Sequence, residues 1–192
     1  MTKNTARISY LLIALVVVLL DRWTKHIVAK RISLYSHIQV IPGFFSLTHT
    51  ENTGAAFSLF ADSNAHWKAA MLIAFSVIAL MVVSVLLWKN HHAHVATGIG
   101  LSLIMGGAVG NLWDRLTSGR VVDFLLFYVK RYQWPVFNLA DSAIVVGAGL
   151  LILEILFHKS SEEFERLSGK GNSRGERFNR DEIHSRQDDA RS

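Results

Sequence analysis

Two long uncharged stretches most constrain what this chain can fold into. Ala69–Trp88 holds 20 residues without a charge, and Val95–Trp113 holds 19. A helix needs about 20 mostly apolar residues to cross the hydrocarbon core of a bilayer. We therefore expect two membrane-spanning helices, and the short segment between them leaves room only for a tight connection.

Two less regular segments complete a predicted set of four spans. Ile8–Leu20 is apolar but only 13 residues long. No small-x-small cleavage site follows it, so we interpret it as an uncleaved span that continues through a charged turn. Ser142–Leu153 carries no charge and, with the residues before it, predicts a fourth span that ends near Phe157. Four spans place both termini on one side of the membrane, but the positive charges near the spans do not decide which side.

Composition argues against a soluble domain and excludes several kinds of site. The first 157 residues hold 12 basic and 7 acidic residues, and residues 158–192 hold eight of each. The excess charge therefore lies among membrane-like segments, and it gives no reason to expect nucleic acid as a partner. The chain has no cysteine, which excludes disulfides, thiolate metal sites and a cysteine nucleophile. We predict a membrane domain over residues 1–157 and a polar, largely disordered tail over residues 158–192.

The segments between the spans hold further predicted structure. β-branched and aromatic residues, with turn signals in this region, predict a few short strands within residues 31–66. Residues 121–129, VVDFLLFYV, are interpreted as a short interfacial helix, with Tyr132 and Trp134 at headgroup depth. The expected fold class is an all-α membrane protein with four transmembrane helices, a small β-sheet and a short interfacial helix.

Acidic residues within or beside the spans are the first candidates for function, because a carboxylate is costly there. Asp123 lies in an apolar run with no local partner, whereas Asp141 comes directly before the fourth span. Two carboxylates in a low-dielectric site cannot both ionise easily, and such a pair can activate water and polarise a carbonyl. A helix N-cap explains Asp141 equally well, so both interpretations stay open for this residue.

Other polar residues are interpreted from their helical spacing. Asp21 and Lys25 are four residues apart, so they share a helix face and can pair. Asn111, Asp114 and Arg115 also share a face, where they form either a polar network or a substrate-binding edge. A structural ion pair is the preferred interpretation of Asp114.

Small residues and histidines carry weaker signals. Asn52 and Gly54 can bring an amide and accessible main chain to a ligand, although a tight turn is the preferred explanation. Gly106 and Gly110 form a GxxxG pattern whose expected role is helix packing. The histidine tract within residues 91–94 looks like a metal site. It lacks acidic and cysteine neighbours, so an interfacial loop is preferred and no metal is expected.

Five motifs, in this order along the chain, resemble one family. They are Asp21-x-x-x-Lys25, Asn52–Phe57, Gly106–Arg115, Val121–Phe124 and Phe137–Ser142. The set closely resembles lipoprotein signal peptidase, also called signal peptidase II, over about residues 8–157. The resemblance implies an intramembrane aspartyl endopeptidase. Such an enzyme removes the signal peptide from diacylglyceryl-modified prolipoproteins by cleaving just before the lipidated cysteine.

The resemblance also implies roles for individual residues. The catalytic dyad falls on Asp123 and Asp141, the pair already selected from the cost of a carboxylate in the membrane. Positions that bind substrate or support the dyad fall on Asn52, Gly54, Asn111, Arg115 and Asn138. Polar residues with a structural role near the site are Asp21, Lys25 and Asp114.

A location and a set of partners follow from the same resemblance. It implies a multi-pass protein of the bacterial cytoplasmic (inner) membrane with both termini in the cytoplasm. The sheet is then extracytoplasmic, the dyad lies towards the outer face, and the 121–134 segment is a covering helix. The implied partners are prolipoprotein substrates and membrane lipids, with no metal, no cofactor and no nucleic acid, and the enzyme is expected to be a monomer.

Three other functions stay open on the residues alone. A small proton-coupled transporter would use Asp21, Asp123 and Asp141 as relay sites, but the chain has few spans and no internal repeat. A non-catalytic assembly protein would use its GxxxG pattern and ion pairs for packing only. A membrane phosphatase would need several basic residues and a histidine near the outer face.

Overall fold

The structure, a computed structural model, describes residues 3–54, 65–89 and 95–157 of the 192-residue chain. The chain forms two units, Met1–Leu151 and Ile152–Ser192, and only residues 152–157 of the second are described. The predicted tail over 158–192 therefore lies outside the described residues, and the domain over 1–157 stays a prediction.

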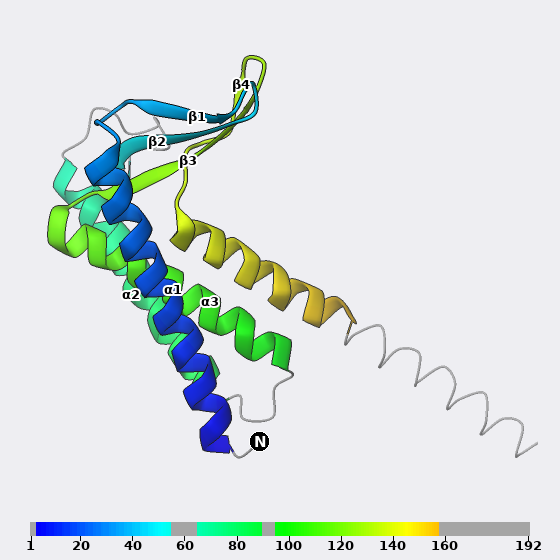
Figure 1. Cartoon of the computed structure of the whole chain (residues 1–192). Coiled ribbons are helices and arrows are strands. Elements are labelled where there is room, and N and C mark those ends of the chain that lie inside the picture. The colour runs from blue at the N-terminus through cyan, green and yellow to red at the C-terminus, as the bar shows by residue number, and fades with distance from the viewer. Residues whose placement is uncertain (1–2, 55–64, 90–94, 158–192) are drawn as a thin grey trace, which may run out of the picture. The chain divides into compact units, whose positions relative to one another are not determined.

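Helices α1 (Lys3–Arg31), α2 (Ala65–Lys89) and α3 (Val95–Ser118) form one bundle, in which α3 packs against both α1 and α2 (Figure 1). Within the described residues, three helical segments are long and apolar enough to cross a membrane: Ala70–Lys89, Val95–Ser118 and Leu139–Phe157. Three of the four predicted spans are thus confirmed by length and composition, as expected of an integral membrane protein.

The first predicted span corresponds to α1, which differs from the other three helices. It has 29 residues, so at 1.5 Å per residue it is about 43 Å long, enough to cross a bilayer. Its apolar run is followed by Asp21, Arg22 and Lys25 within the same helix, and it is not among the apolar helices identified above. Its passage through the membrane stays a prediction.

Glycines in α3 allow neighbouring helices to approach closely. A Cβ atom on Gly106 would lie 2.7 Å from the carbonyl oxygen of Ala14 in α1. A Cβ atom on Gly107 would lie 2.4 Å from the carbonyl oxygen of Ala140, in the Leu139–Phe157 helix. Both distances are too short for any residue larger than glycine. The packing role predicted for this stretch is therefore confirmed, and it brings the start of the last helix against α3.

The strands predicted within residues 31–66 are present. The sheet has the order β1-β2-β3-β4, and each pair of neighbours is antiparallel. Its strands are β1 (His37–Ile41), β2 (Phe45–Asn52), β3 (Val121–Val129) and β4 (Tyr132–Gln133). Asp123 and Phe124 are successive residues of β3, so their side chains lie on opposite faces of the sheet. Phe124 packs with Val28 of α1 and with Ile32, which directly follows that helix.

The interfacial helix predicted over residues 121–129 is wrong, because these residues form strand β3. Six of the nine residues are β-branched or aromatic: Val121, Val122, Phe124, Phe127, Tyr128 and Val129. Such side chains fit a pleated surface better than a helix. Antiparallel pairing with β2, which places Thr50 opposite Asp123 and Asn52 opposite Val121, decides between the two conformations. That partner is distant in sequence and invisible to local pattern.

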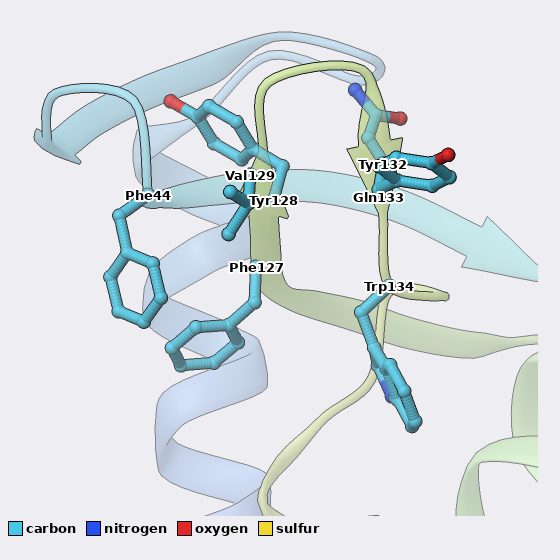
Figure 2. Close-up of a pocket in the computed structure, with 7 residues that line it drawn as sticks. All are labelled: Phe44, Phe127, Tyr128, Val129, Tyr132, Gln133 and Trp134. Atoms are coloured by element: carbon cyan, nitrogen blue, oxygen red, sulfur yellow. The ribbon is translucent and has the colours of Figure 1, made fainter.

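The β3–β4 hairpin carries an aromatic hollow of about 360 Å³. In Figure 2 the rings of Phe44, Phe127 and Trp134 point downwards, and the ring of Tyr128 lies above them. Phe127 packs edge-on against Phe44, with ring centroids 5.5 Å apart. The side chains of Tyr132 and Trp134 are largely exposed, which is compatible with the headgroup position predicted for them.

Candidate active site

Asp123 is held at the junction between the sheet and the helices by amide groups from two other segments. Its Oδ1 accepts a hydrogen bond from Nδ2 of Asn138 at 2.7 Å, and its Oδ2 accepts one from Nδ2 of Asn52 at 3.0 Å. The hydroxyl of Thr50 donates to the carbonyl oxygen of Asp123 at 3.0 Å. The side chain is almost fully buried, so it meets amide donors in place of water.

Asp141 belongs to a reciprocal cap at the start of the Leu139–Phe157 helix. The backbone N–H of Asp141 donates to Oδ1 of Asn138 at 3.0 Å, and the backbone N–H of Asn138 donates to Oδ2 of Asp141 at 3.2 Å. This is the arrangement of a capping box, with Asn138 as the N-cap and Asp141 as the third helical residue. The N-cap interpretation of Asp141 was therefore wrong by three residues, because Asn138 occupies that position.

One asparagine thus joins both candidate carboxylates. Nδ2 of Asn138 donates to Asp123, while Oδ1 and the backbone N–H of Asn138 bind Asp141. Asn138 is fully buried, so its orientation is fixed on both sides. Two acidic residues that are 18 positions apart in the sequence are brought to one place by the side chain and backbone of this one residue.

A second asparagine extends the network into the helices. Nδ2 of Asn111, in α3, donates to Oδ1 of Asp141 at 2.7 Å. Oδ1 of Asn111 accepts from Nδ2 of Asn138 at 3.2 Å and from Nζ of Lys25 at 3.1 Å. The structure therefore places three predicted site residues, Asn111, Asn138 and Asp141, in direct contact.

The polar residues of α1 form a buried ion-pair cluster beside this network. Nζ of Lys25 lies 2.7 Å from Oδ2 of Asp21 and 2.8 Å from Oδ2 of Asp114. Oδ1 of Asp21 accepts from the backbone N–H of Ala140 at 3.0 Å. The predicted pairing of Asp21 with Lys25 is therefore confirmed, and so is the ion-pair interpretation of Asp114.

Arg22 is a member of this cluster that sequence reasoning missed. Its guanidinium pairs with Oδ1 of Asp114. Arg22 and Lys25 are three residues apart on α1, so the helical spacing that paired Asp21 with Lys25 also contained the signal for Arg22. Thr50 was missed too, and no local pattern could have found it, because its partner Asp123 lies 73 residues further along the chain.

Asn52 and Gly54 form a turn at the end of β2. The backbone N–H of Gly54 donates to Oδ1 of Asn52 at 2.8 Å, which turns the Nδ2 group of Asn52 towards Asp123. Gly54 has φ of +89°, a conformation that favours glycine. A Cβ atom there would also lie 2.3 Å from Cδ1 of Leu72. The turn interpretation is thus confirmed, and the turn orients a donor to Asp123.

Arg115 supplies positive charge next to the carboxylates. Its Nη1 donates to the carbonyl oxygen of Asn111 at 3.2 Å, and its charge interacts with Asp141 and Asp123. The residue is only partly buried. Arg115 therefore lies beside the hydrogen-bond network, whereas Asn138 links the two acidic residues within it.

The electrostatic environment favours a proton on Asp123. Burial raises the pKa of its carboxyl from 3.8 to about 6, and the nearby Asp141 carboxylate adds to the rise. Hydrogen bonds from Asn52 and Asn138 and the charge of Lys25 act in the opposite direction. A carboxyl with this pKa exchanges its proton near neutral pH, which suits general acid–base chemistry.

An open hollow of about 300 Å³ lies against Asp123. It is lined by Thr50, Glu51, Asn52, Thr53, Asp123, Pro135 and Val136. Three of these residues belong to β2, and Pro135 and Val136 belong to the segment that leads to Asn138. The hollow therefore lies beside Asp123, between β2 and that segment.

No group of three or more histidine, cysteine or acidic side chains with metal-binding geometry occurs among the described residues. The predicted interfacial loop with its histidine tract, residues 91–94, lies outside them. The carboxylates of the site instead bind amides and cations of the protein itself.

Comparison with known proteins places the chain in a family. Residues 13–157 match the family described as signal peptidase (SPase) II. The chain is 42% identical over 144 residues to the lipoprotein signal peptidase of Solibacter usitatus, which covers 75% of this chain and 88% of the relative. It is 44% identical over 146 residues to that of Symbiobacterium thermophilum, which covers 76% and 93%.

Solved structures agree with the sequence relatives. One, described as a bacterial membrane enzyme, is 31% identical, with a TM-score of 0.70, and covers 80% of this chain and 90% of that one. A second, with the same description, is 32% identical, with a TM-score of 0.68, and covers 77% and 92%. The resemblance inferred from five motifs is confirmed. The chain therefore belongs to the signal peptidase II family, the proteases that remove signal peptides from lipoproteins.

Proposed function

We propose that this protein is an aspartyl endopeptidase whose catalytic dyad is Asp123 and Asp141. The observation that carries the proposal is the pair of carboxylates bound to opposite ends of Asn138. Asp123 adjoins an open hollow, and Asn138, which binds both acidic residues, is buried. Asp123 is therefore held from behind by a buried group and borders an open space, as an active site requires.

The proposed mechanism uses one proton shared by the two carboxyls. The ionised member takes a proton from water while the protonated member donates a hydrogen bond to the scissile carbonyl oxygen. Water attacks the carbonyl carbon, a tetrahedral gem-diol forms, and the dyad protonates the leaving amine. The raised pKa of Asp123 favours it as the member that is protonated first, although the two carboxyls titrate as one unit.

The proposed substrates are prolipoproteins that carry diacylglycerol on a cysteine, cleaved just before that cysteine. The hollow between β2 and the 135–136 segment would hold the peptide around the scissile bond. Asn52, Gly54 and Arg115 would contact substrate or support the dyad, and Asn111 and Asn138 would hold the carboxylates. The apolar helices leave large side chains exposed, and the substrate's signal helix and lipid would enter laterally between them.

The proposed location is the bacterial cytoplasmic (inner) membrane, with both termini in the cytoplasm and the dyad towards the outer face. α3 ends at Ser118 and the last helix begins at Leu139, so the β3–β4 hairpin leaves and re-enters at one membrane face. Tyr132 and Trp134 on that hairpin would lie among the headgroups. The protein would act as a monomer surrounded by lipid.

The test uses purified protein in detergent or lipid, with a diacylglyceryl-modified prolipoprotein and its unlipidated form as substrates. We expect cleavage of the lipidated form alone, just before the modified cysteine. Asp123→Asn and Asp141→Asn should each abolish cleavage while they keep a cooperative melting transition. EDTA should leave the rate unchanged, because no step of the mechanism uses a metal.

The controls separate chemistry from folding. Asp114→Asn removes a carboxylate of the buried ion-pair cluster that touches neither Asp123 nor Asp141. It should lower thermal stability and retain measurable cleavage. Wild-type rates in either Asp123→Asn or Asp141→Asn would remove that residue from the mechanism, and equal cleavage of both substrate forms would refute the proposed lipid requirement.

A further inference from the structure

Lys25 has an unusual set of partners for a buried lysine. Its side chain is 3% exposed, and its ammonium group contacts Oδ2 of Asp21 at 2.7 Å, Oδ2 of Asp114 at 2.8 Å and Oδ1 of Asn111 at 3.1 Å. An ammonium group has three donors and no acceptor. One donor binds the carboxylate of Asp21 and another binds the amide oxygen of Asn111, while the Asp114 carboxylate is held as an ion pair.

This third contact fixes which end of Asn111 points towards the dyad. Because an ammonium group can only donate, the atom of Asn111 that it contacts must be the oxygen. The amide nitrogen then points the other way, where it donates to Oδ1 of Asp141 at 2.7 Å. A reversed amide would place its NH₂ group against the ammonium and its oxygen against the Asp141 carboxylate, and both contacts would be repulsive.

The same oxygen also receives the second asparagine. Nδ2 of Asn138 donates to Oδ1 of Asn111 at 3.2 Å and to Oδ1 of Asp123 at 2.7 Å. The orientation of Asn111 therefore constrains Asn138, and through it the donor that faces Asp123. Both carboxylates are therefore linked to Lys25 through the side-chain amide of Asn111, directly for Asp141 and through Asn138 for Asp123.

We propose that Lys25 is a positioning residue for catalysis, which orients Asn111 and Asn138 so that their NH₂ groups face Asp141 and Asp123. The inference rests on the proposed dyad and extends it to a charged residue of α1 that contacts neither carboxylate of the dyad. The need to neutralise Asp114 does not by itself explain why a lysine is present at position 25, because Arg22 also pairs with the Asp114 carboxylate. Of these two cations, Lys25 alone is bonded to Asn111.

The experiment is a double-mutant cycle between Lys25→Met and Asn111→Ala, with kcat and KM measured on lipidated substrate. We expect Lys25→Met to lower kcat about tenfold or more, with little change in KM, because donors to the reacting carboxylates are misplaced. In the Asn111→Ala background the same change should lower kcat no further, since the intermediary is already gone. Equal losses of kcat in both backgrounds would mean a merely structural role and would overturn the inference.

Arg22→Gln is the matched control. It removes the other cation of Asp114 but leaves the Asn111 contact intact, so it should change the melting temperature and not kcat. If Lys25→Met does not fold, the cycle is run with Asp114→Asn present in all four proteins, which removes one of the buried carboxylates that Lys25 neutralises. Full kcat in the Lys25→Met and Asp114→Asn combination would also refute the inference.

A second readout follows from the charge. Lys25 is the cation that lowers the pKa of Asp123, while Asp21, Asp114, Arg22 and Arg115 remain around the site in the Lys25→Met protein. The alkaline limb of the kcat–pH profile, where Asp123 loses its proton, should therefore move to higher pH in Lys25→Met and stay in place in Arg22→Gln. If the proposed dyad is itself wrong, the result is different, because Asp123→Asn or Asp141→Asn would then still cleave the substrate.

Discussion

Asn138 and Asp141 bind each other in both directions, since the backbone N–H of each donates to the side chain of the other, at 3.2 and 3.0 Å. The pair ends the irregular segment after β4 and starts the last helix. It also fixes the carboxylate of Asp141 at the positive end of that helix, where a negative charge is stabilised. Capping and placement of the candidate dyad are therefore performed by the same two residues.

Substitutions at Asn138 should separate these two tasks. A serine retains a cap, because its hydroxyl accepts from the N–H of Asp141, but it has no NH₂ group for Asp123. We expect Asn138→Ser to be about 1 kcal/mol more stable than Asn138→Ala, the usual value of an N-cap. Both should lose most cleavage activity. Thermal melts and the prolipoprotein assay on the two purified variants make the comparison.

Wild-type cleavage by Asn138→Ser would contradict this prediction, because it would mean that the donor to Asp123 is dispensable. Ser142→Ala is a suitable control. The Ser142 hydroxyl donates to the carbonyl oxygen of Asn138 at 2.9 Å within the same first turn, but it has no hydrogen bond to either carboxylate. This variant should lose some stability and little activity.

The stability of the protein should depend on pH through Asp123. Its pKa is about 6 when folded and 3.8 as an ordinary carboxyl. Between these values the unfolded chain holds fewer protons than the folded one, so stability is complete below about pH 4 and falls as pH rises through about 6. The loss amounts to about 3 kcal/mol for a shift of about two units.

The comparison that isolates this effect is wild type against Asp123→Asn, melted in detergent from pH 4 to pH 7.5. The variant has no ionisable group at this position, so its stability relative to the wild type should rise between about pH 4 and pH 6 and then level off. A constant difference in melting temperature would show that Asp123 is not buried with a raised pKa.

Much of the candidate site is predictable from the sequence because membrane burial makes polar residues conspicuous. Asp21, Lys25, Asn111, Asp114 and Arg115 stand out by helical spacing alone. Their grouping in the structure confirms the network and the ion pairs. Asp123 stands out because no local partner explains it, and the structure supplies partners from two distant segments.

The parts that could not be predicted depend on contacts distant in sequence. VVDFLLFYV has the apolar character of an interfacial helix, and only pairing with β2 makes it a strand. The sequence leaves Asp141 open as the N-cap, whereas the N-cap is Asn138, because the start of a helix is uncertain by a few residues when only composition defines it. Neither error moved a carboxylate out of the site, since both residues were identified by their cost of burial.

The β3–β4 hairpin should lie in the headgroup region of the membrane. The chain has no cysteine, so a single Tyr132→Cys substitution gives one spin label at a position where the native side chain is 73% exposed. The measurement compares how often the label collides with oxygen and with a water-soluble nickel reagent in vesicles. The ratio of oxygen collisions to nickel collisions should exceed the ratio for a free label in water. It should stay below the ratio at Phe75→Cys, an equally exposed position within the apolar run of α2. A ratio equal to that in water would place the hairpin outside the membrane.

The close approach of α1 and α3 should be most sensitive at Gly110. A Cβ atom there would lie 2.6 Å from Oδ2 of Asp21, the atom that binds Lys25. Gly110→Ala must therefore displace a buried carboxylate that also holds the backbone of Ala140, and it should lower the free energy of unfolding by about 1–3 kcal/mol, as overpacking does.

Gly149→Ala is the matched control, because nothing lies within 4 Å of a Cβ atom at that position. There, the higher helix propensity of alanine should leave stability unchanged or raise it by up to about 1 kcal/mol. Thermal melts of both variants decide the matter, and equal stability of the two would mean that Asp21 can move without loss. If Gly110→Ala also loses cleavage in proportion to the displacement of Lys25, the helix contact and the dyad are coupled through Asp21, as the hydrogen bonds predict.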